Sequence, residues 1–347
     1  MSSILTQTSE TPSESQHTPW VEKYRPKNLD DVASQDHAVA VLKKTLQSAN
    51  LPHMLFYGPP GTGKTSTVLA LAKELYGPNL IKSRVLELNA SDERGILIVR
   101  QKVKTFARLT VSNPSADDLA RYPCPPYKII ILDEADSMTS DAQSALRRTM
   151  ETYSGVTRFC LICNYITRII DPLASRCSKF RFRPLDDANA LARLAHVADT
   201  ERVNREAGVL EQVLRIANGD LRKAITFLQS ATRLHLDGDE VAEITNKSIL
   251  EIAGVVPDEV IGRLIAASAA KDMEKLFTTV NDVMLEGWSS VQILSQVHDL
   301  LILDDSLQPD QKSRISRVLF ETDKRLSAGA DEHVQVLNLL SQLSLIL

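Results

Sequence analysis

Glycine and aromatic residues are both scarce in this sequence. Only 13 of the 347 residues are glycine, about half the usual share of roughly 7%, and aromatic residues make up 5%. Both shortages favour helices and argue against a β-sandwich, whose strands and turns use these residue types. Three of the glycines nevertheless fall within the short stretch from Gly58 to Thr65. A cluster of glycines in a glycine-poor chain indicates a local requirement for them.

An excess of charge and long apolar runs are absent as well. The 40 basic and 44 acidic residues give a net charge of −4, so any contact with nucleic acid must come from a local basic patch. No run reaches the length of about 18 apolar residues that marks a transmembrane helix, and we expect no membrane association. Because no long apolar run precedes the first basic residue, Lys23, we expect neither a signal peptide nor an Arg-rich transit peptide.

Cysteine is also rare, and two of the four cysteines have the spacing of a zinc site. Cys160-Leu-Ile-Cys163 lies in an apolar run with strand character. In a strand, residues three apart point to opposite faces, and no glycine turn is present to bring the two thiols together. We therefore favour buried thiols in a reducing compartment over a zinc site.

Composition and periodicity divide the chain into a leader and three further segments. Residues 1–19 contain nine Ser or Thr and are predicted to be a disordered leader. Residues 20–185 alternate continuous apolar runs with helical stretches, which is typical of a parallel α/β sheet. Residues 186–253 and 254–347 are each predicted to be all helical. The strands are expected at 54–57, 85–89, 129–133, 159–164 and 180–182, and the first helices beyond them near 186–202, 209–217 and 220–234.

The glycine cluster has the sequence of a phosphate-binding loop. Gly58-Pro-Pro-Gly-Thr-Gly-Lys64-Thr65 fits G-x-x-x-x-G-K-[ST], and it lies between an expected strand and an apolar-periodic helix. Glycines let backbone N–H groups turn toward phosphate oxygens at a helix N-terminus. Lys64 is expected to neutralise the β- and γ-phosphates, and the Thr65 hydroxyl to bind Mg²⁺. The residues expected to contact nucleotide here are Gly58, Pro59, Pro60, Gly61, Thr62, Gly63, Lys64, Thr65 and Ser66.

An acidic motif follows the strand-like run Ile129-Ile-Ile-Leu: Asp133-Glu134-Ala-Asp136. Ligands of open α/β sheets bind at the carboxyl ends of strands. Asp133 is therefore expected to contact Mg²⁺ through water, and Glu134 to polarise the attacking water as a general base. The alternative is that two adjacent acids only cap a following helix. The same four letters occur in DEAD-box helicases, but that class needs a second α/β lobe, and the sequence after residue 185 is helical.

Further motifs accompany these two: Trp20-Val-Glu-Lys-Tyr-Arg-Pro26, Asn164, Ser175-Arg176-Cys177 and Gly219-Asp-Leu-Arg222. Together they resemble the AAA+ clamp-loader ATPases and, within them, the small subunits of eukaryotic replication factor C. The resemblance covers residues 20 to about 347. It implies an α/β P-loop AAA+ domain, with a parallel five-stranded sheet and flanking helices. An all-helical lid and an all-helical collar, the module that holds five subunits together, would follow.

The resemblance also implies roles for residues outside the phosphate loop. Asn164 matches sensor 1, a strand-end amide that orients water against the γ-phosphate. Arg222 matches sensor 2, which reports bound ATP to the lid. Arg176 matches the arginine finger, which acts in trans on ATP in a neighbouring subunit, so one chain alone would be an incomplete enzyme. Val21 and Arg25 belong to an N-terminal box that closes over the adenine.

A basic stripe is expected on the helix that starts near residue 96. Between residues 94 and 108 there are five basic residues and no acid. At about 100° per residue, positions 100, 104 and 108 share one face. A solvated face is the ordinary explanation, whereas the resemblance implies contacts with duplex phosphates, which position DNA without reading bases. The residues expected to bind DNA are Arg94, Arg100, Lys104 and Arg168.

The end of the same helix is the expected contact with a ring-shaped clamp. By resemblance, Phe106 and Leu109 are candidates for apolar contact with it, and the alternative for Phe106 is a place in the core. The following stretch, Val111 to Lys128, contains four prolines and is predicted to form a loop without a regular element.

The function implied is that of an ATP- and Mg²⁺-dependent subunit of a nuclear clamp loader. Its partners would be the other replication factor C subunits in a heteropentamer, a sliding clamp of the proliferating cell nuclear antigen type, and primer-template DNA. One alternative is a P-loop small-molecule kinase, which would act alone and would not need the helical residues 186–347. Another is an ATP-binding scaffold that does not hydrolyse, which the intact Lys64, Thr65, Asp133 and Glu134 argue against.

Overall fold

The computed structural model describes residues 18–31, 35–48, 50–91, 96–111, 114–234, 236–237, 240–241 and 243–347. The chain forms two compact units, one of residues 1–203 with 210–229 and one of residues 204–209 with 230–347. Only Thr18 and Pro19 of the predicted leader are described. Its disorder therefore remains a prediction.

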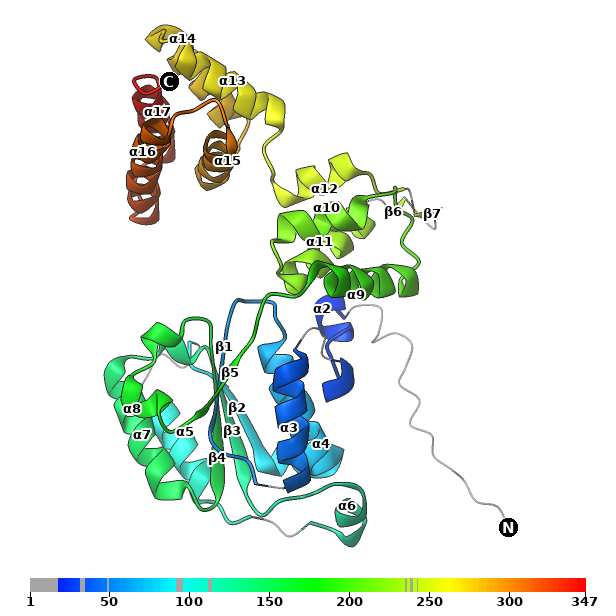
Figure 1. The fold of residues 1–347 in the computed structure, drawn as a ribbon. Helices are drawn as coiled ribbons and strands as arrows, with labels where there is room; N and C mark the ends of the chain where they lie inside the picture. The colour runs from blue at the N-terminus through cyan, green and yellow to red at the C-terminus, as the bar shows by residue number, and fades with distance from the viewer. Residues whose placement is uncertain are drawn as a thin grey trace. The chain divides into compact units, whose positions relative to one another are not determined.

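A parallel sheet forms the centre of the first unit (Figure 1). Its five strands have the order β2-β3-β4-β1-β5, which confirms the predicted parallel five-stranded sheet. The predicted strands lie within three residues of the observed ends. The strands are β1 (Met54–Tyr57), β2 (Val85–Asn89), β3 (Lys128–Asp133), β4 (Thr157–Cys163) and β5 (Ser178–Arg181).

Successive residues of the central strands point into two different cores, as continuous apolar strands require. Ile129 and Ile131 belong to the core beneath α3 (Asp36–Ser48) and α4 (Lys64–Arg84). Ile130 and Leu132 belong to the core beneath α5 (Ile96–Arg108), α7 (Ser140–Tyr153) and α8 (Asp171–Ala174) (Figure 1). The two cysteines of β4 follow the same alternation: Cys160 lies in the first core and Cys163 in the second. Burial raises the pKa of both thiols, that of Cys163 to about 12, so both are protonated at neutral pH.

Helices cover both faces of the sheet and connect its strands (Figure 1). The helix that follows the phosphate loop, α4, continues to Arg84. It bends at Gly77, which has non-helical φ and ψ and precedes Pro78. The helices of this part of the chain are α2 (Trp20–Lys23), η1 (Leu29–Asp31), α3 (Asp36–Ser48), α4 (Lys64–Arg84), α5 (Ile96–Arg108), α6 (Ala116–Arg121), η2 (Ala135–Ser137), α7 (Ser140–Tyr153), η3 (Ile166–Arg168) and α8 (Asp171–Ala174).

The prediction that residues 111–128 hold no regular element is wrong, because α6 forms there. Ser115 starts this short helix by accepting a hydrogen bond from the Asp118 amide at 3.2 Å, and such a cap offsets the cost of a single helical turn. Tyr122 then packs against the bend of α4. A Cβ atom at Gly77 would lie 2.4 Å from the Tyr122 ring.

Three helices follow the sheet at the predicted positions: α9 (Asp187–Thr200), α10 (Val209–Ala217) and α11 (Leu221–Leu234). Within the segment predicted to be all helical, the described residues also contain two paired strands of two residues each, β6 (Leu236–Asp237) and β7 (Glu240–Val241). Strands this short carry no detectable periodicity. The helical character of this segment is otherwise confirmed.

The second unit is helical beyond β7, as predicted, and carries its own apolar core. Its fully buried members include one residue on each of five different helices: Leu264, Val280, Ile293, Ile315 and Leu340. No helix within the described ranges is long and apolar enough to cross a bilayer. The helices are α12 (Asn246–Ala253), α13 (Asp258–Ala269), α14 (Met273–Leu285), α15 (Ser290–Leu303), α16 (Pro309–Ser327) and α17 (Glu332–Leu343).

Candidate nucleotide site

The strand order explains why the predicted site residues meet. Strand β4 lies between β1 and β3, and all three are parallel, so their carboxyl ends lie at one edge of the sheet. The phosphate loop leaves β1, Asp133 ends β3, and Asn164 follows β4. Three segments that are distant in sequence are thus brought to one place.

The phosphate loop has the backbone that its glycines allow. Gly61 has φ +71° and Gly63 has φ +87°, a left-handed conformation that costs other residues about 1–2 kcal/mol. Gly61 also lies against the start of α11, because a Cβ atom there would be 1.9 Å from Oδ1 of Asp220. Gly63 ends the loop as the residue before α4, so the N–H groups of the first helical turn are open toward the loop.

The Lys64 side chain is buried inside the phosphate loop. It is 7% exposed, and its ammonium donates to the carbonyls of Gly58 at 2.8 Å and Pro59 at 2.7 Å. A third bond reaches Oδ1 of Asn164 at 3.0 Å. Burial lowers the pKa of this ammonium from 10.5, and the nearby Asp133 carboxylate opposes that shift. The charged Lys64 ammonium is therefore fixed at the loop, and each of its three N–H groups donates a hydrogen bond.

Thr65 and the first acid of the acidic motif are in direct contact. The Thr65 hydroxyl donates to Oδ2 of Asp133 at 2.7 Å, and Oδ1 of Asp133 accepts from the Glu134 amide at 2.9 Å. Glu134 itself is exposed and has φ +52°. A non-glycine residue in this region carries strain of order 1–3 kcal/mol and is frequent at functional sites. The acidic pair does not simply cap a following helix: Glu134 precedes the 3-10 turn η2 without a side-chain capping bond, and α7 is capped by Thr139.

Asp136, the last acid of the motif, holds the end of β4. Its Oδ2 accepts hydrogen bonds from the backbone amides of Asn164 at 3.2 Å and Tyr165 at 3.1 Å. Sequence analysis assigned no role to Asp136. Its place in an acidic motif was the available signal, but the partner amides lie 28 and 29 residues away.

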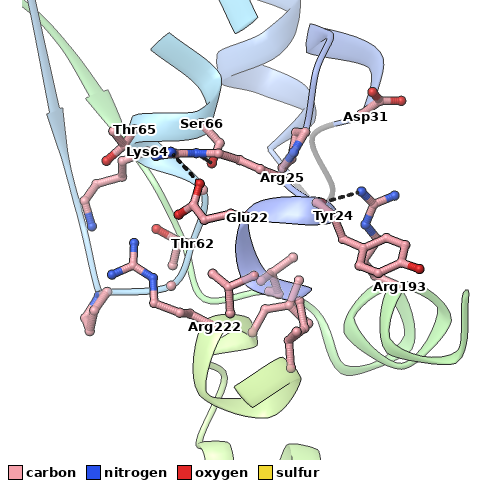
Figure 2. A pocket seen from close by; sticks show the side chains of 18 of the residues that line it. Glu22, Tyr24, Arg25, Asp31, Thr62, Lys64, Thr65, Ser66, Arg193 and Arg222 are labelled. Atoms are coloured by element: carbon pink, nitrogen blue, oxygen red, sulfur yellow. Dashed lines mark hydrogen bonds and ion pairs between the residues drawn. The ribbon is translucent and has the colours of Figure 1, made fainter. Parts of the chain in front are cut away.

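The N-terminal segment supplies another wall of the pocket. Arg25 donates through Nε to the Ser66 hydroxyl at 3.3 Å and pairs with Glu22 at 3.1 Å. Tyr24 contributes a backbone carbonyl, which accepts from Arg193 of α9 at 3.1 Å. Figure 2 shows Arg25 extending from this segment toward the start of α4. The segment is thus bonded both to the phosphate-loop helix and to α9.

The start of α11 supplies a further wall. Asp220 accepts through Oδ1 from the amides of Arg222 at 2.9 Å and Lys223 at 3.3 Å, which fixes the first turn of the helix. Arg222, Leu221 and Ile225 line the pocket, and Figure 2 shows Arg222 below the phosphate loop.

One pocket thereby collects most of the predicted nucleotide-binding residues. Apolar side chains, Val21, Leu185 and Ile225 among them, line it together with the charged loop. Gly58 and Pro59 do not line it and instead hold Lys64 by their carbonyls. Glu22, Asp31 and Arg193 line it without having been predicted. The predicted residues that do line it are Val21, Arg25, Pro60, Gly61, Thr62, Gly63, Lys64, Thr65, Ser66, Asp133, Glu134, Asn164 and Arg222.

Arg176 lies outside this pocket. It follows α8, its guanidinium pairs with Glu151 of α7 at 2.5 Å, and it donates to the Pro172 carbonyl at 2.5 Å. The Arg176 side chain is 37% exposed. Among the described residues, the arginines that line the pocket are Arg25, Arg193 and Arg222.

The predicted DNA-binding residues lie on two elements. Lys104 is exposed on α5, and Arg168 is exposed at the end of η3, with its guanidinium 5.2 Å from the centre of the Tyr165 ring. Arg94 lies outside the described residues. Arg100 lies in α5, but its side chain is not described.

The end of α5 carries an apolar groove. Leu86, Phe106 and Leu109 line it, and Leu109 is 56% exposed. The buried Lys128 of β3 donates to the carbonyls of Phe106 and Leu109 and lies 4.9 Å from the centre of the Phe106 ring. Phe106 packs partly against the core while also lining the groove, so the two predictions for Phe106 are compatible.

Three family models match successive parts of the chain. Residues 54–185 match the ATPase family associated with various cellular activities (AAA), and residues 192–233 match the RCF1/5-like AAA+ ATPase lid domain. Residues 256–342 match the replication factor C C-terminal domain. The solved structure of a Thermotoga maritima RuvB variant aligns with a TM-score of 0.52 at 18% identity, over 70% of this chain and 79% of that one. At that identity the likeness shows the fold alone.

Curated relatives match nearly the whole chain. Replication factor C subunit 2 of Saccharomyces cerevisiae is 63% identical, covering 94% of this chain and 92% of the relative. Replication factor C subunit 4 of Homo sapiens is 57% identical, covering 92% and 86%. The replication factor C small subunit of Aeropyrum pernix is 41% identical, covering 94% and 95%.

The chain has a parallel sheet with a phosphate loop after β1 and an acidic pair after β3, and a helical lid follows the sheet. These features define an ATPase of the AAA class. Identity over nearly the whole length takes the assignment further: the chain belongs to the replication factor C family of clamp-loader small subunits. Within that family the sequence motifs resemble most the subunit numbered second in yeast and fourth in humans, and the relatives' names confirm this prediction. The comparisons support an ATPase of a clamp loader over a small-molecule kinase or a scaffold that does not hydrolyse.

Proposed function

We propose that this chain binds ATP in the pocket described above and that ATP binding and hydrolysis drive the loading of a ring-shaped clamp onto primed DNA. The observation that carries the proposal is the hydrogen-bonded cluster at the sheet edge. Lys64 bonds to Asn164, and Thr65 bonds to Asp133. The lid arginine Arg222 lines the same pocket. In this scheme residues 20–185 form the nucleotide-binding α/β domain, residues 186–253 form the lid, and residues 254–347 form the collar.

The residues present fit ATP and Mg²⁺. Lys64 and the N–H groups at the start of α4 would hold the β- and γ-phosphates, and the apolar side chains of Val21 and Ile225 would contact the base, near Arg25. Thr65 and Asp133 offer a hydroxyl and a carboxylate side by side, the hard oxygen ligands that Mg²⁺ prefers. Thr65 would bind the ion directly and Asp133 through water. The ion, when bound, supplies neutralisation of phosphate charge.

Glu134 and Asn164 are proposed to prepare the attacking water. The exposed Glu134 carboxylate lines the pocket and accepts a proton from water as general base. Asn164 orients that water through its side-chain amide, whose oxygen bonds to Lys64 at 3.0 Å. Arg222 contacts the phosphates from the lid, so that bound nucleotide and lid position are coupled.

Arg176 is proposed to act on a neighbouring subunit. It does not line its own pocket, it is 37% exposed, and it lies beside α7. An arginine that reaches the γ-phosphate of a neighbour stabilises transition-state charge and raises the rate by about 10³–10⁵-fold. By the same reasoning, ATP bound to this chain needs an arginine from another subunit. The partners are therefore the other replication factor C subunits, in a heteropentamer.

Primer-template DNA and the clamp are proposed to meet the same α/β domain. Arg94, Arg100, Lys104 and Arg168 would contact duplex phosphates, which suits recognition of DNA by shape rather than by sequence. The groove lined by Phe106 and Leu109 offers an apolar surface to the clamp. These partners assign the protein to the nucleus.

The test is a clamp-loading assay with the complete complex, primed DNA and a fluorescent clamp. Glu134→Gln keeps the shape of the side chain and removes the general base, so ATP should bind normally while ATP turnover at this site is lost. Lys64→Ala should abolish ATP binding at this site. Asp141→Asn, which alters an exposed acid of α7, is the matched control and should load clamps normally. Normal loading and turnover by both Glu134→Gln and Lys64→Ala would contradict the proposal.

A further inference from the structure

The segment after β3 does more than present Glu134 to the pocket. Two residues after Glu134, Asp136 lies in the 3-10 turn η2 and accepts two backbone N–H groups through one carboxylate oxygen. These belong to Asn164 at 3.2 Å and Tyr165 at 3.1 Å. Hydrogen bonds to a charged acceptor are roughly twice as strong as neutral ones. The acidic turn and the end of β4 are therefore joined at the residue proposed to orient water.

We propose that Asp136 is a positioning residue for ATP hydrolysis: it fixes the backbone of Asn164 so that the Asn164 side chain faces Lys64 and the attacking water. The inference rests on the catalytic role proposed for Asn164. The backbone of Asn164 is bonded on one side to Asp136, and its side-chain oxygen is bonded on the other side to Lys64. Freed from Asp136, the strand end would no longer hold that amide at one place.

Asp136 and the proposed general base, Glu134, lie in one short segment of the chain. Through its hydrogen bonds, Asp136 links this segment to Asn164, whose side chain is proposed to orient water. Ser137 stiffens this segment, since both its amide, at 2.9 Å, and its hydroxyl, at 2.7 Å, donate to the Glu134 carbonyl. Glu134 has left-handed φ and ψ and directly precedes the turn that contains Asp136. The two residues therefore share a rigid backbone. Glu134 and Asn164 are held at a fixed separation as long as Asp136 bonds to the β4 end. Misplacement of a catalytic group by about 1 Å can cost about 100-fold in rate.

Asp136 is also a negative charge near Lys64, whose pKa it tends to raise. An effect of charge alone and an effect of positioning respond differently to substitution. Asp136→Asn removes the charge and keeps a side-chain oxygen that can accept both N–H groups. Asp136→Ala removes the charge and the acceptor. Positioning therefore predicts that the Asn variant retains much of the activity that the Ala variant loses, whereas a charge effect makes the two variants alike.

The experiment measures kcat and ATP affinity in the assembled complex with primed DNA and clamp, with turnover at the other subunits' sites removed by Glu→Gln substitution of their general-base glutamates, which leaves ATP bound there. The variants are Asp136→Ala, Asp136→Asn, Asn164→Ala and Asp136→Ala with Asn164→Ala. Asp141→Ala controls for loss of an acid in the same region. We expect Asp136→Ala to lower kcat by about 10- to 100-fold with ATP affinity within about twofold of wild type. Asp136→Asn should lower kcat severalfold less.

The double variant decides whether Asp136 acts through Asn164. If it does, Asp136→Ala causes no further loss of kcat once Asn164 is alanine. Equal losses in both backgrounds, a normal kcat for Asp136→Ala, or equal kcat values for the Ala and Asn variants would each overturn the proposal. If Asp136→Ala does not fold, Asp136→Asn is combined with Asn164→Ala and judged by the same non-additivity. A normal kcat for Asn164→Ala alone would refute the catalytic role of Asn164, and the positioning role of Asp136 with it.

Discussion

Substitution of Gly61 by alanine should displace the start of the lid helix α11 from the phosphate loop. At φ +71° an alanine costs about 1–2 kcal/mol. Its Cβ atom would also lie 1.9 Å from Oδ1 and 3.0 Å from Cα of Asp220, so the cap of α11 must move. The bonds from Asp220 to the amides of Arg222 and Lys223 would then be lost, at about 1 kcal/mol for a helix cap. The total loss of stability is about 2–3 kcal/mol.

Gly63→Ala is the matched control. Its φ of +87° imposes the same backbone cost, but no atom of the described residues lies within 4 Å of the added Cβ. Thermal unfolding should therefore show Gly61→Ala melting below Gly63→Ala by about 2–4 °C, the shift that corresponds to about 1 kcal/mol in a domain of this size. Binding of a fluorescent ATP analogue should weaken more in Gly61→Ala, because Arg222 moves with the cap. Equal melting temperatures and equal affinities would refute the contact between Gly61 and Asp220.

Three shorter predictions concern other parts of the same domain. Arg176→Ala should lower ATP turnover at the adjacent subunit by at least about 10³-fold while this chain still binds ATP; unchanged turnover there would exclude a trans role. Thr65→Val should raise the Mg²⁺ concentration needed for half-maximal turnover, whereas Thr65→Ser, which keeps the hydroxyl, should not; equal Mg²⁺ requirements would contradict Thr65 as a ligand. Burial lowers the pKa of His53 from 6.5 to about 4. Stability should therefore be full above pH 6.5 and decline as the pH falls toward 4, because the unfolded chain binds the extra proton. In His53→Asn, whose Oδ1 can accept the Phe159 amide as Nδ1 now does at 3.1 Å, that decline in denaturant melts should be shallower; an identical decline would contradict the assignment.

Local signals were sufficient to predict the sheet and the phosphate loop. Each strand is a continuous apolar run, and Gly58 to Thr65 requires the strand, loop and helix that the structure contains. Asp133 could be predicted because ligands of open α/β sheets bind at the carboxyl ends of strands, whereas Asn164, which ends the next strand, was assigned its role by the resemblance. Only the resemblance, and not the residues alone, pointed to Arg222, which shares its pocket with the loop through the placement of α11.

Features that depend on contacts between distant segments could not be predicted from sequence. The pairing of Asp136 with two amides of the β4 end depends on the turn η2 and on the order of the strands. Lys128 in β3 is a further case, because its ammonium holds the last carbonyls of α5. For Asp136 and Lys128, one polar side chain bonds to backbone groups that are distant in the sequence, and sequence patterns do not locate such partners. The prediction for α6 failed for a different, local reason: Ser115 caps this short helix by accepting from the amide of Asp118, three residues on, within a polar, proline-rich stretch.

The central proposal is that this chain binds ATP in its own pocket and that hydrolysis of this ATP needs an arginine from a neighbouring subunit. The most direct measurement is steady-state ATP turnover by the isolated chain, then by the same chain assembled with its partner subunits, and finally with primed DNA and the clamp. Wild-type chain and Glu134→Gln are compared at every step. We predict little turnover by the isolated chain and a large, Glu134-dependent increase on assembly and addition of DNA and clamp. Rapid turnover by the isolated chain, unchanged by those additions, would contradict the account.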